Sequence, residues 1–343
     1  MINPTIQQMM TTRKKRRVKF IGTTLLLASI VLLLCAAMMM LGNTIYPVQE
    51  IIRVLMGDVI PGSSFAINEI RLPRMLAGLF AGFSFGVGGY IFQTMLRNPL
   101  ANPDVIGVTT GSSAAAVCCI VLFHASNLVL SLSSIAGGLV TVLIIYVLSK
   151  QNAFAIGRLI LIGIGIQAML SAAISYMMLI GKTNDLPTVL RWLSGSLNSA
   201  NMPMIMSLML CIFCAMPIVL YCSKRLSMLE LGEQAATALG VNTNKTRVVL
   251  IICAVMLIAL ATATTGPIAF VAFLAGPIAQ RIVGSAFSNI LPAGFIGVIL
   301  VLGADLIGQF AFETRYPVGV ITGIVGAPYL IYLLIRINRK GVI

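Results

Sequence analysis

Apolar segments about as long as a bilayer is thick recur along almost the whole chain, with short polar stretches between them. A helix needs about 20 apolar residues to cross a hydrocarbon core about 30 Å thick, so each run predicts one transmembrane helix. The predicted spans are residues 20–42, 74–96, 105–124, 127–149, 158–181, 202–222, 246–264, 267–285, 290–312 and 318–337. The fold class is therefore an all-α polytopic membrane protein with about ten transmembrane helices. An even number of spans places both termini on the same side.

Three longer polar stretches interrupt this pattern. Residues 43–73 form an outer loop in which YPVQEIIRVLMG predicts a short amphipathic helix. Residues 183–201 form a second outer amphipathic piece, which carries the only Trp. Residues 226–245 lie on the inner side. Since no polar domain separates the spans, we expect a single transmembrane domain over residues 1–343, with a basic cytoplasmic tail at residues 1–19.

Composition and charge fix the class and the orientation. Only 9% of the residues are charged and 59% are hydrophobic, whereas soluble domains have about 25% charged residues. This excludes an ordinary soluble enzyme, a disordered protein and a nucleic-acid-binding domain. The predicted loops place 17 of the 23 Lys and Arg residues on one side, which the positive-inside rule makes the cytoplasm. Both termini are therefore predicted to be cytoplasmic, with an uncleaved first span rather than a signal peptide.

The inner stretch 229–240, LELGEQAATALG, predicts a short amphipathic helix. We expect one apolar side and one polar side, with glycines flanking the helix. The residues concerned are Leu229, Ala236 and Leu239 on the apolar side, Glu230 and Glu233 on the polar side, and Gly232 and Gly240 as the flanks. The segment is too short and polar to span a membrane. It is either a solvated loop helix or a docking helix for a cytoplasmic subunit.

Glycine and proline mark further features within the spans. Gly78, Gly82 and Gly86 leave one helix face bare, and bare faces let transmembrane helices approach closely. Two Gly-Pro pairs stand at 266–267 and 276–277. Proline frees backbone carbonyls, and a membrane tolerates this only where neighbours or water satisfy them. The broken helices indicate either a cavity or gate, or a tight re-entrant packing motif.

Two polar features inside the spans are candidates for function. Asp305 is the only acid there, and we favour a structural role for it over a functional one. In the fifth span, Gly163, Gln167, Ser171 and Ser175 follow one another at intervals of four residues. Such a polar stripe needs a cavity or a partner helix.

Several motifs together resemble a known family. RLPR, NPLANPDVIGVTTG, RWLSGSL, LELGEQAATALGV, GPIAFVAFLAGPIAQR and GVITGIVGAPYLIYLL occur in this order over residues 71–334. The chain thus resembles the FecCD-type permeases of ATP-binding-cassette (ABC) importers for ferric siderophores, haem and cobalamin. The resemblance implies a type II importer architecture with two permease subunits around one pathway. It also implies two cytoplasmic ATPases and an extracytoplasmic substrate-binding protein as partners.

The resemblance also implies roles for particular residues. Arg71 and Arg74, with Arg315 as a third candidate, would dock the binding protein, although the arginines could instead anchor to lipid headgroups. Residues 229–240 would couple to the ATPase. The pathway would be lined by the fifth and tenth spans. It would include the polar stripe of the fifth span and an inner gate formed by Ala155, Ile156 and Gly157.

The implied function is a permease that moves an iron–siderophore complex across the bacterial cytoplasmic membrane by alternating access. The chain has no Walker motif, so ATP hydrolysis is expected on a partner and the chain is not expected to be an enzyme. Many family members have Pro-His where this chain has Gly276-Pro277. The Gly-Pro form resembles siderophore members with two different permease chains, which indicates a heterodimeric partner. Many members also have an Arg where this chain has Gln309, so their Asp–Arg pairing is not expected here.

Other functions stay open at this point. Haem and cobalamin are the alternative substrates within the family. An ion-coupled secondary transporter would need ionisable groups near the membrane midplane, and Asp305 is the one candidate. An intramembrane enzyme is disfavoured because the spans contain no paired carboxylates, metal-ligand cluster or Ser-His arrangement. No residue pattern predicts a cofactor or a metal site.

Overall fold

The computed structural model describes residues 4–149, 156–198, 200–284 and 286–339, and these residues form helices and connecting loops without a strand. The long helices are α1 (Pro4–Met40), α4 (Leu72–Met95), α6 (Asn127–Ser149), α7 (Ile156–Ile180), α9 (Met202–Glu230), α11 (Thr243–Thr265), α13 (Ile290–Phe310) and α14 (Val318–Arg339). The shorter ones are α2 (Val48–Leu55), α3 (Ser63–Phe65), η1 (Ala66–Arg71), η2 (Pro103–Ile106), α5 (Val108–Phe123), α8 (Leu186–Ser194), α10 (Glu233–Ala238) and α12 (Val271–Val283). The all-α prediction is confirmed.

The ten predicted spans each correspond to one apolar helix. Eight helices of the described chain are long and apolar enough to cross a membrane, and α5 and α12 are shorter apolar helices. At about 1.5 Å per residue, the 13 residues of α12 extend only about 20 Å. This helix starts at Val271 rather than at 267, because Phe270 has a φ of 65°, which is a left-handed and not a helical conformation.

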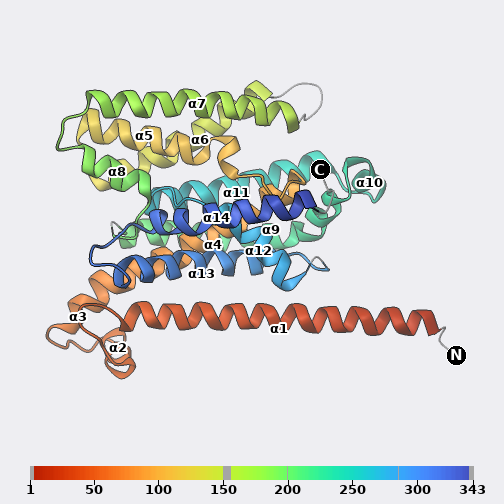
Figure 1. The fold of residues 1–343 in the computed structure, drawn as a ribbon, viewed down its shortest axis with the longest axis horizontal. Coiled ribbons are helices and arrows are strands. Elements are labelled where there is room, and N and C mark those ends of the chain that lie inside the picture. The colour runs from red at the N-terminus through yellow and green to blue at the C-terminus, as the bar shows by residue number, and fades with distance from the viewer. Residues whose placement is uncertain (1–3, 150–155, 199, 285, 340–343) are drawn as a thin grey trace.

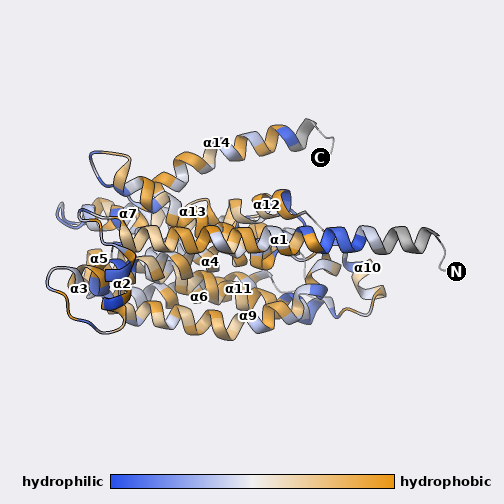
Figure 2. Cartoon of the chain, turned by 90° about the horizontal axis from the view of Figure 1, so that it is seen from below, coloured by the Kyte–Doolittle hydropathy of each residue, from blue (hydrophilic) through white to orange (hydrophobic). Residues whose placement is uncertain are grey.

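The helices run roughly along one direction, with α1 and α7 at opposite edges of the molecule (Figure 1). Hydrophilic residues gather at the two ends (Figure 2). One end carries α2, α3 and α8, and we name it the outer end after the predicted topology. The other carries α10 and the basic start of α1, and we name it the inner end.

Helix α4 occupies the centre and packs against α9, α11, α12 and α13. Its glycines allow the closest of these contacts. A Cβ atom at Gly86 would lie 2.2 Å from the carbonyl oxygen of Ala293, and one at Gly82 would lie 2.8 Å from that of Gly297. Both obstacles are backbone atoms of α13, which cannot move aside as a side chain would. The bare glycine face predicted from the sequence is therefore the α4–α13 packing surface.

Candidate functional site

The proline inside α12 leaves one backbone carbonyl without its helical donor, and a side chain of a neighbouring helix donates to that carbonyl instead. Pro277 has no N–H to donate to the carbonyl of Phe273, four residues earlier in α12. The side chain of Gln93, on α4, donates from Nε2 to that carbonyl oxygen at 2.8 Å. Gly276 leaves room for this amide, since a Cβ there would lie 2.1 Å from Oε1 of Gln93. The second Gly-Pro pair is thus a tight packing motif between α4 and α12.

The first Gly-Pro pair lies where several outer segments meet. The Ser196 N–H donates to the carbonyl of Thr265 at 2.7 Å, and the Gly319 N–H donates to that of Gly195 at 3.3 Å. Gly195 has a φ of 68°, and a Cβ atom on it would lie 2.5 Å from the carbonyl oxygen of Pro267. The RWLSGSL motif therefore joins the end of α8 to the end of α11 and the start of α14.

A buried ion pair holds the outer end together. Arg74 donates to Asp305 through Nη2 at 2.7 Å and through Nε at 2.8 Å, and the carboxylate is 1% exposed. Gln309 donates to the same carboxylate at 2.6 Å, and Asn198 accepts from Arg74 Nη1 at 2.5 Å. These contacts join α4, α13 and the segment after α8. They give Asp305 the structural role that we favoured, and Arg74 of α4 is its cationic partner.

The other two candidate docking arginines bind the end of α1 and the segment that follows it. Arg71 donates to the carbonyls of Met39 at 2.7 Å and Met40 at 2.8 Å, and its guanidinium lies 4.5 Å from the ring centre of Tyr46. Arg315 is exposed and donates to the side chain of Asn43 at 2.6 Å. All three candidate docking arginines therefore lie at the outer end with partners inside this chain. Docking itself stays a prediction.

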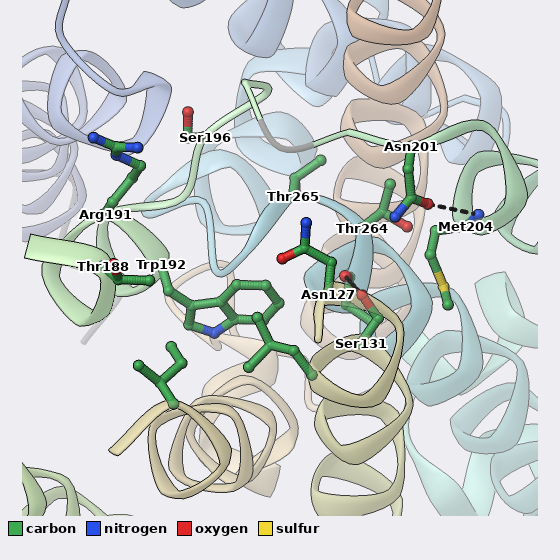
Figure 3. Close-up of a pocket in the computed structure, with 13 residues that line it drawn as sticks. Asn127, Ser131, Thr188, Arg191, Trp192, Ser196, Asn201, Met204, Thr264 and Thr265 are labelled. Carbon is green, nitrogen blue, oxygen red and sulfur yellow. Dashed lines mark hydrogen bonds between the residues drawn. The ribbon is translucent and has the colours of Figure 1, made fainter. Parts of the chain in front are cut away.

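A cavity of about 210 Å³, lined by both polar and apolar side chains, lies beside α8 at the outer end (Figure 3). It is enclosed by α5, α6, α8, α9 and α11, and its lining includes Asn127, Ser131, Arg191, Trp192, Asn201 and Thr265. The indole Nε1 of Trp192 is buried without a hydrogen-bond partner among the described residues. Ligand pockets usually measure about 300–1,000 Å³, so this cavity is too small for a bulky chelate. Apart from the isolated Trp, no sequence pattern signals it.

The candidate pathway residues of α7 lie on a helix that this chain covers only partly. Helix α7 packs against α5, α6 and η2. Gly163 is buried, Gln167 is half-buried, and Ser171 and Ser175 are exposed. The Ser175 hydroxyl donates to the carbonyl of Ser171 at 3.0 Å, so it is satisfied within the helix.

The predicted inner gate is described only in part. Ala155 lies outside the described residues, and Ile156 is described only as the first residue of α7, without its side chain. Gly157 is exposed, and a Cβ there would meet no atom within 4 Å. The steric surroundings in this chain therefore do not require a glycine at that position.

The structure corrects the predicted apolar side of the inner segment 229–240. The helix covers only Glu233–Ala238, because Gly232 has a φ of 107° and Gly240 one of 80°. Leu229 and Ala236 are buried against Val241 within the chain, and Ala236 is 0% exposed. Leu239 lies beyond the helix and is 58% exposed, as is Leu231 at 65%. The surface open to a partner is therefore formed by Leu231 and Leu239, not by Leu229 and Ala236.

The two acids of this segment differ in their surroundings. Glu233 pairs with the buried Arg247 of α11 at 3.3 Å and accepts from the Thr243 hydroxyl at 3.4 Å. This contact fastens α10 to α11. Glu230 is exposed at the end of α9. Only Glu230 therefore matches the predicted rim position, since Glu233 is occupied by an internal partner.

The NPLANPDVIG motif forms a compact turn before α5. Asn102 donates from Nδ2 to Asp104 Oδ2 at 2.8 Å, and the Thr109 hydroxyl donates to the other carboxylate oxygen. Burial raises the pKa of Asp104 to about 6, against the opposing effect of the Asn102 hydrogen bond. Gly107 follows with a φ of 70° and is the N-cap residue directly before α5. The turn explains why this polar motif needs both Asn102 and the glycine.

Comparison with known proteins places this geometry in context. A sequence model described as the FecCD transport family matches residues 27–336. The chain is 38% identical over 304 residues to the ferric enterobactin transport system permease protein FepG of Escherichia coli. The aligned residues cover 87% of this chain and 91% of that protein. It is 36% identical over 279 residues to the Fe(3+)-citrate import system permease protein YfmE of Bacillus subtilis, covering 80% and 84%.

A solved structure has the same fold. It is described as an inward-facing conformation of a metal-chelate type ABC transporter, and it superimposes with a TM-score of 0.82 at 27% sequence identity. The match covers 92% of this chain and 99% of that one. The likeness therefore extends over nearly the whole helical arrangement and not only over a core.

Proposed function

Since this chain belongs to the FecCD transport family, we propose that it is the permease subunit that moves a ferric siderophore across the bacterial cytoplasmic membrane. The chain is a multi-pass membrane transport subunit with the fold of a type II ABC importer permease, and it is not an enzyme. The observation that carries the proposal is the family match over residues 27–336, which reaches all ten apolar helices. The names of the relatives, which refer to iron chelates, support the substrate class.

The importer requires a second permease and ATPases, and in our proposal the second permease is a different, homologous chain. The largely open faces of α7 and α14 support a pathway between the two permeases. Substrate enters from an extracytoplasmic binding protein at the outer end, where Arg71 and Arg315 lie. Because Arg74 is committed to Asp305, it contributes by holding the outer end in shape.

Two copies of a cytoplasmic ATPase drive alternating access through the inner segment 226–245. Leu231 and Leu239 offer exposed apolar side chains, and Glu230 lies beside Leu231 in the chain as an exposed charge. An apolar contact of this kind fits a groove on the partner. Leu229 and Ala236 support the contact from within, because they form the small core that holds the segment. Both termini lie in the cytoplasm in this arrangement.

Reconstitution tests the proposal. The permease pair, the ATPases and the binding protein are placed in proteoliposomes, and uptake of radioactive iron as a ferric siderophore is measured with and without ATP. We expect uptake only when ATP and the binding protein are both present. Uptake that follows an imposed ion gradient without ATP would contradict the proposal and favour a secondary transporter.

A further inference from the structure

The amphipathic helix α2 at the outer end buries only part of its apolar side. Ile51 and Val54 pack with Met39 of α1 and Ile67 of η1. A second row of apolar side chains remains 45–81% exposed, and we name it the α2 stripe: Val48, Ile52, Leu55 and Met56. The intervals of four, three and one positions place these residues on one face of a helix with 3.6 residues per turn. The chain therefore leaves half of an apolar helix face uncovered.

The contacts of α2 fix the direction in which the α2 stripe faces. Ile51 and Val54 hold the helix from one side. On the polar side, Arg53 pairs with Asp58 at 2.9 Å, and both side chains are exposed. The helix cannot turn to bury the stripe without exposing Ile51 and Val54. The stripe therefore needs an apolar partner from outside this chain.

The position of α2 along the bundle indicates which apolar partner it meets. The apolar part of α1, from Phe20 to Met40, extends about 30 Å at about 1.5 Å per residue, which is the thickness of a hydrocarbon core. Helix α2 follows directly after this span. Beside it, the guanidinium of Arg71 lies 4.5 Å from the ring centre of Tyr46, and tyrosine is enriched where a span leaves the hydrocarbon. Helix α2 thus lies at the outer membrane surface.

The surface next to α2 is one that lipid covers. Helix α1 lies at the edge of the molecule opposite α7, and α2 lies beside the outer end of α1 (Figure 1). Among the apolar side chains that α1 leaves exposed are Leu25, Leu26, Leu32 and Leu33. Exposed leucines in a span at the edge of the bundle face acyl chains. The α2 stripe continues this lipid-facing surface at its outer end.

The two protein partners of the importer fit this place less well. The second permease, in the proposed arrangement, meets the open face of α7, which is at the opposite edge of the molecule (Figure 1). A binding protein that docks on Arg71 and Arg315 presents acids to them. The flanks of α2 carry acids of their own, Glu50 and Asp58, which would repel such a surface. Lipid is therefore the occupant that both position and charge favour.

We propose that α2 is an interfacial helix whose stripe inserts into the outer surface of the bilayer. An amphipathic helix of this kind lies in the plane of the membrane, with its apolar face about 5–10 Å deep in the boundary between headgroups and acyl chains. The partner is the acyl region of phospholipids rather than a particular headgroup, because Arg53, the only cation in α2, is paired with Asp58. The inference needs only that the chain spans a membrane, and it does not depend on the substrate.

Depth-dependent fluorescence quenching in the complete importer complex tests the inference. The complex is placed in nanodiscs whose phospholipids carry bromine either near the headgroup end or near the methyl end of the acyl chains. The reporters are Leu55→Trp and, as a second position, Ile52→Trp. The matched control is Arg53→Trp, on the polar side of the same helix. The emission of the unmodified complex, which includes Trp192, is subtracted, and each measurement is repeated with the binding protein added.

We expect bromine near the headgroup end to quench both reporters severalfold more strongly than the control, and more strongly than bromine near the methyl end does. Adding the binding protein should leave this quenching unchanged. The inference is overturned if the reporters are quenched no more than Arg53→Trp, whether water or the second permease surrounds them. It is also overturned if bromine near the methyl end quenches more strongly, or if the binding protein abolishes the quenching. The last result would make the α2 stripe part of the docking surface instead.

Discussion

The amide of Gln93 substitutes for a hydrogen bond that proline removes from α12, and this exchange can be measured. Pro277 leaves the carbonyl of Phe273 without its helical donor, and Gln93 Nε2 supplies one from α4 at 2.8 Å. Gln93 is buried, so water cannot easily replace it. Replacing Gln93 by Leu keeps a similar volume but leaves the carbonyl unsatisfied. A buried polar group without a partner costs about 1–3 kcal/mol.

The structure also predicts a rescue. In the Pro277→Ala variant, the backbone N–H of residue 277 can donate to Phe273 within α12, and Gln93 is no longer needed for this purpose. Gln93→Leu should therefore cost about 1–3 kcal/mol in the protein that retains Pro277 and distinctly less in the Pro277→Ala background. The difference is the coupling energy of a double-mutant cycle.

The assay is reversible unfolding of the purified permease in mixed micelles of lipid and detergent, with the four proteins of the cycle compared under one condition. Gly303→Ala serves as a control for general helix substitutions, because a Cβ there would meet no atom within 4 Å. A coupling energy of zero would refute the reasoning. So would a Gln93→Leu variant as stable as the unmodified protein.

Three further changes test other contacts. Asp305→Ala should destabilise the protein by about 3–5 kcal/mol, because it leaves the guanidinium of Arg74 unpaired, and Asp305→Ala combined with Arg74→Leu should recover part of the loss in the same unfolding assay. Ala236→Arg should disrupt the inner segment and lower both stability and ATPase copurification, whereas Leu231→Asp with Leu239→Asp should lower copurification alone. An Ala236→Arg variant as stable as the unmodified protein would contradict the buried position of Ala236. The pKa of Asp104 rises from 3.8 in the unfolded chain to about 6 in the folded one, so between these pH values the folded state binds more protons than the unfolded state. The stabilisation from this carboxyl group is therefore fully present below pH 3.8 and is lost as pH rises through about 6. Asp104→Asn should flatten that part of the pH profile, and an unchanged slope would count against the assignment.

The spans could be predicted from the sequence because the signal is local. Each needs only a run of apolar residues, and every one of the ten runs became a helix. The short amphipathic helix at Val48–Leu55 was likewise predicted from its own pattern and buries Ile51 and Val54. The start of α12 was wrong by four residues, since hydropathy does not reveal that Phe270 has a positive φ.

The contacts between distant segments could not be predicted in this way. Arg74 and Asp305 are 231 positions apart, and no local sequence pattern around either residue indicates that the other is its partner. The prediction for the inner segment 229–240 was wrong for a different reason. A helical projection over residues 229–240 assumes one continuous helix, whereas Gly232 interrupts it and α10 has only six residues. Leu239 was therefore placed on the wrong side.

The distribution of these contacts separates a fixed core from the parts that can move. Helix α4 holds α13 through its glycines and Arg74, and α12 through Gln93, so these helices form one tightly packed unit. Helices α7 and α14 make fewer contacts within the chain, and a backbone hydrogen bond from Gly319 to Gly195 links the start of α14 to the segment after α8. Alternating access needs elements that have two packings of similar free energy. A close-packed backbone contact such as that at Gly86 offers one packing only. By the same criterion the end of α8 is fixed, because Gly195 packs against the backbone of Pro267, and so is the start of α14, because Gly319 packs against the backbone of Ser194. We therefore expect the conformational change to occur in α7 and in α14 beyond Gly319, while α4, α12 and α13 transmit it between the outer and inner ends as a rigid body.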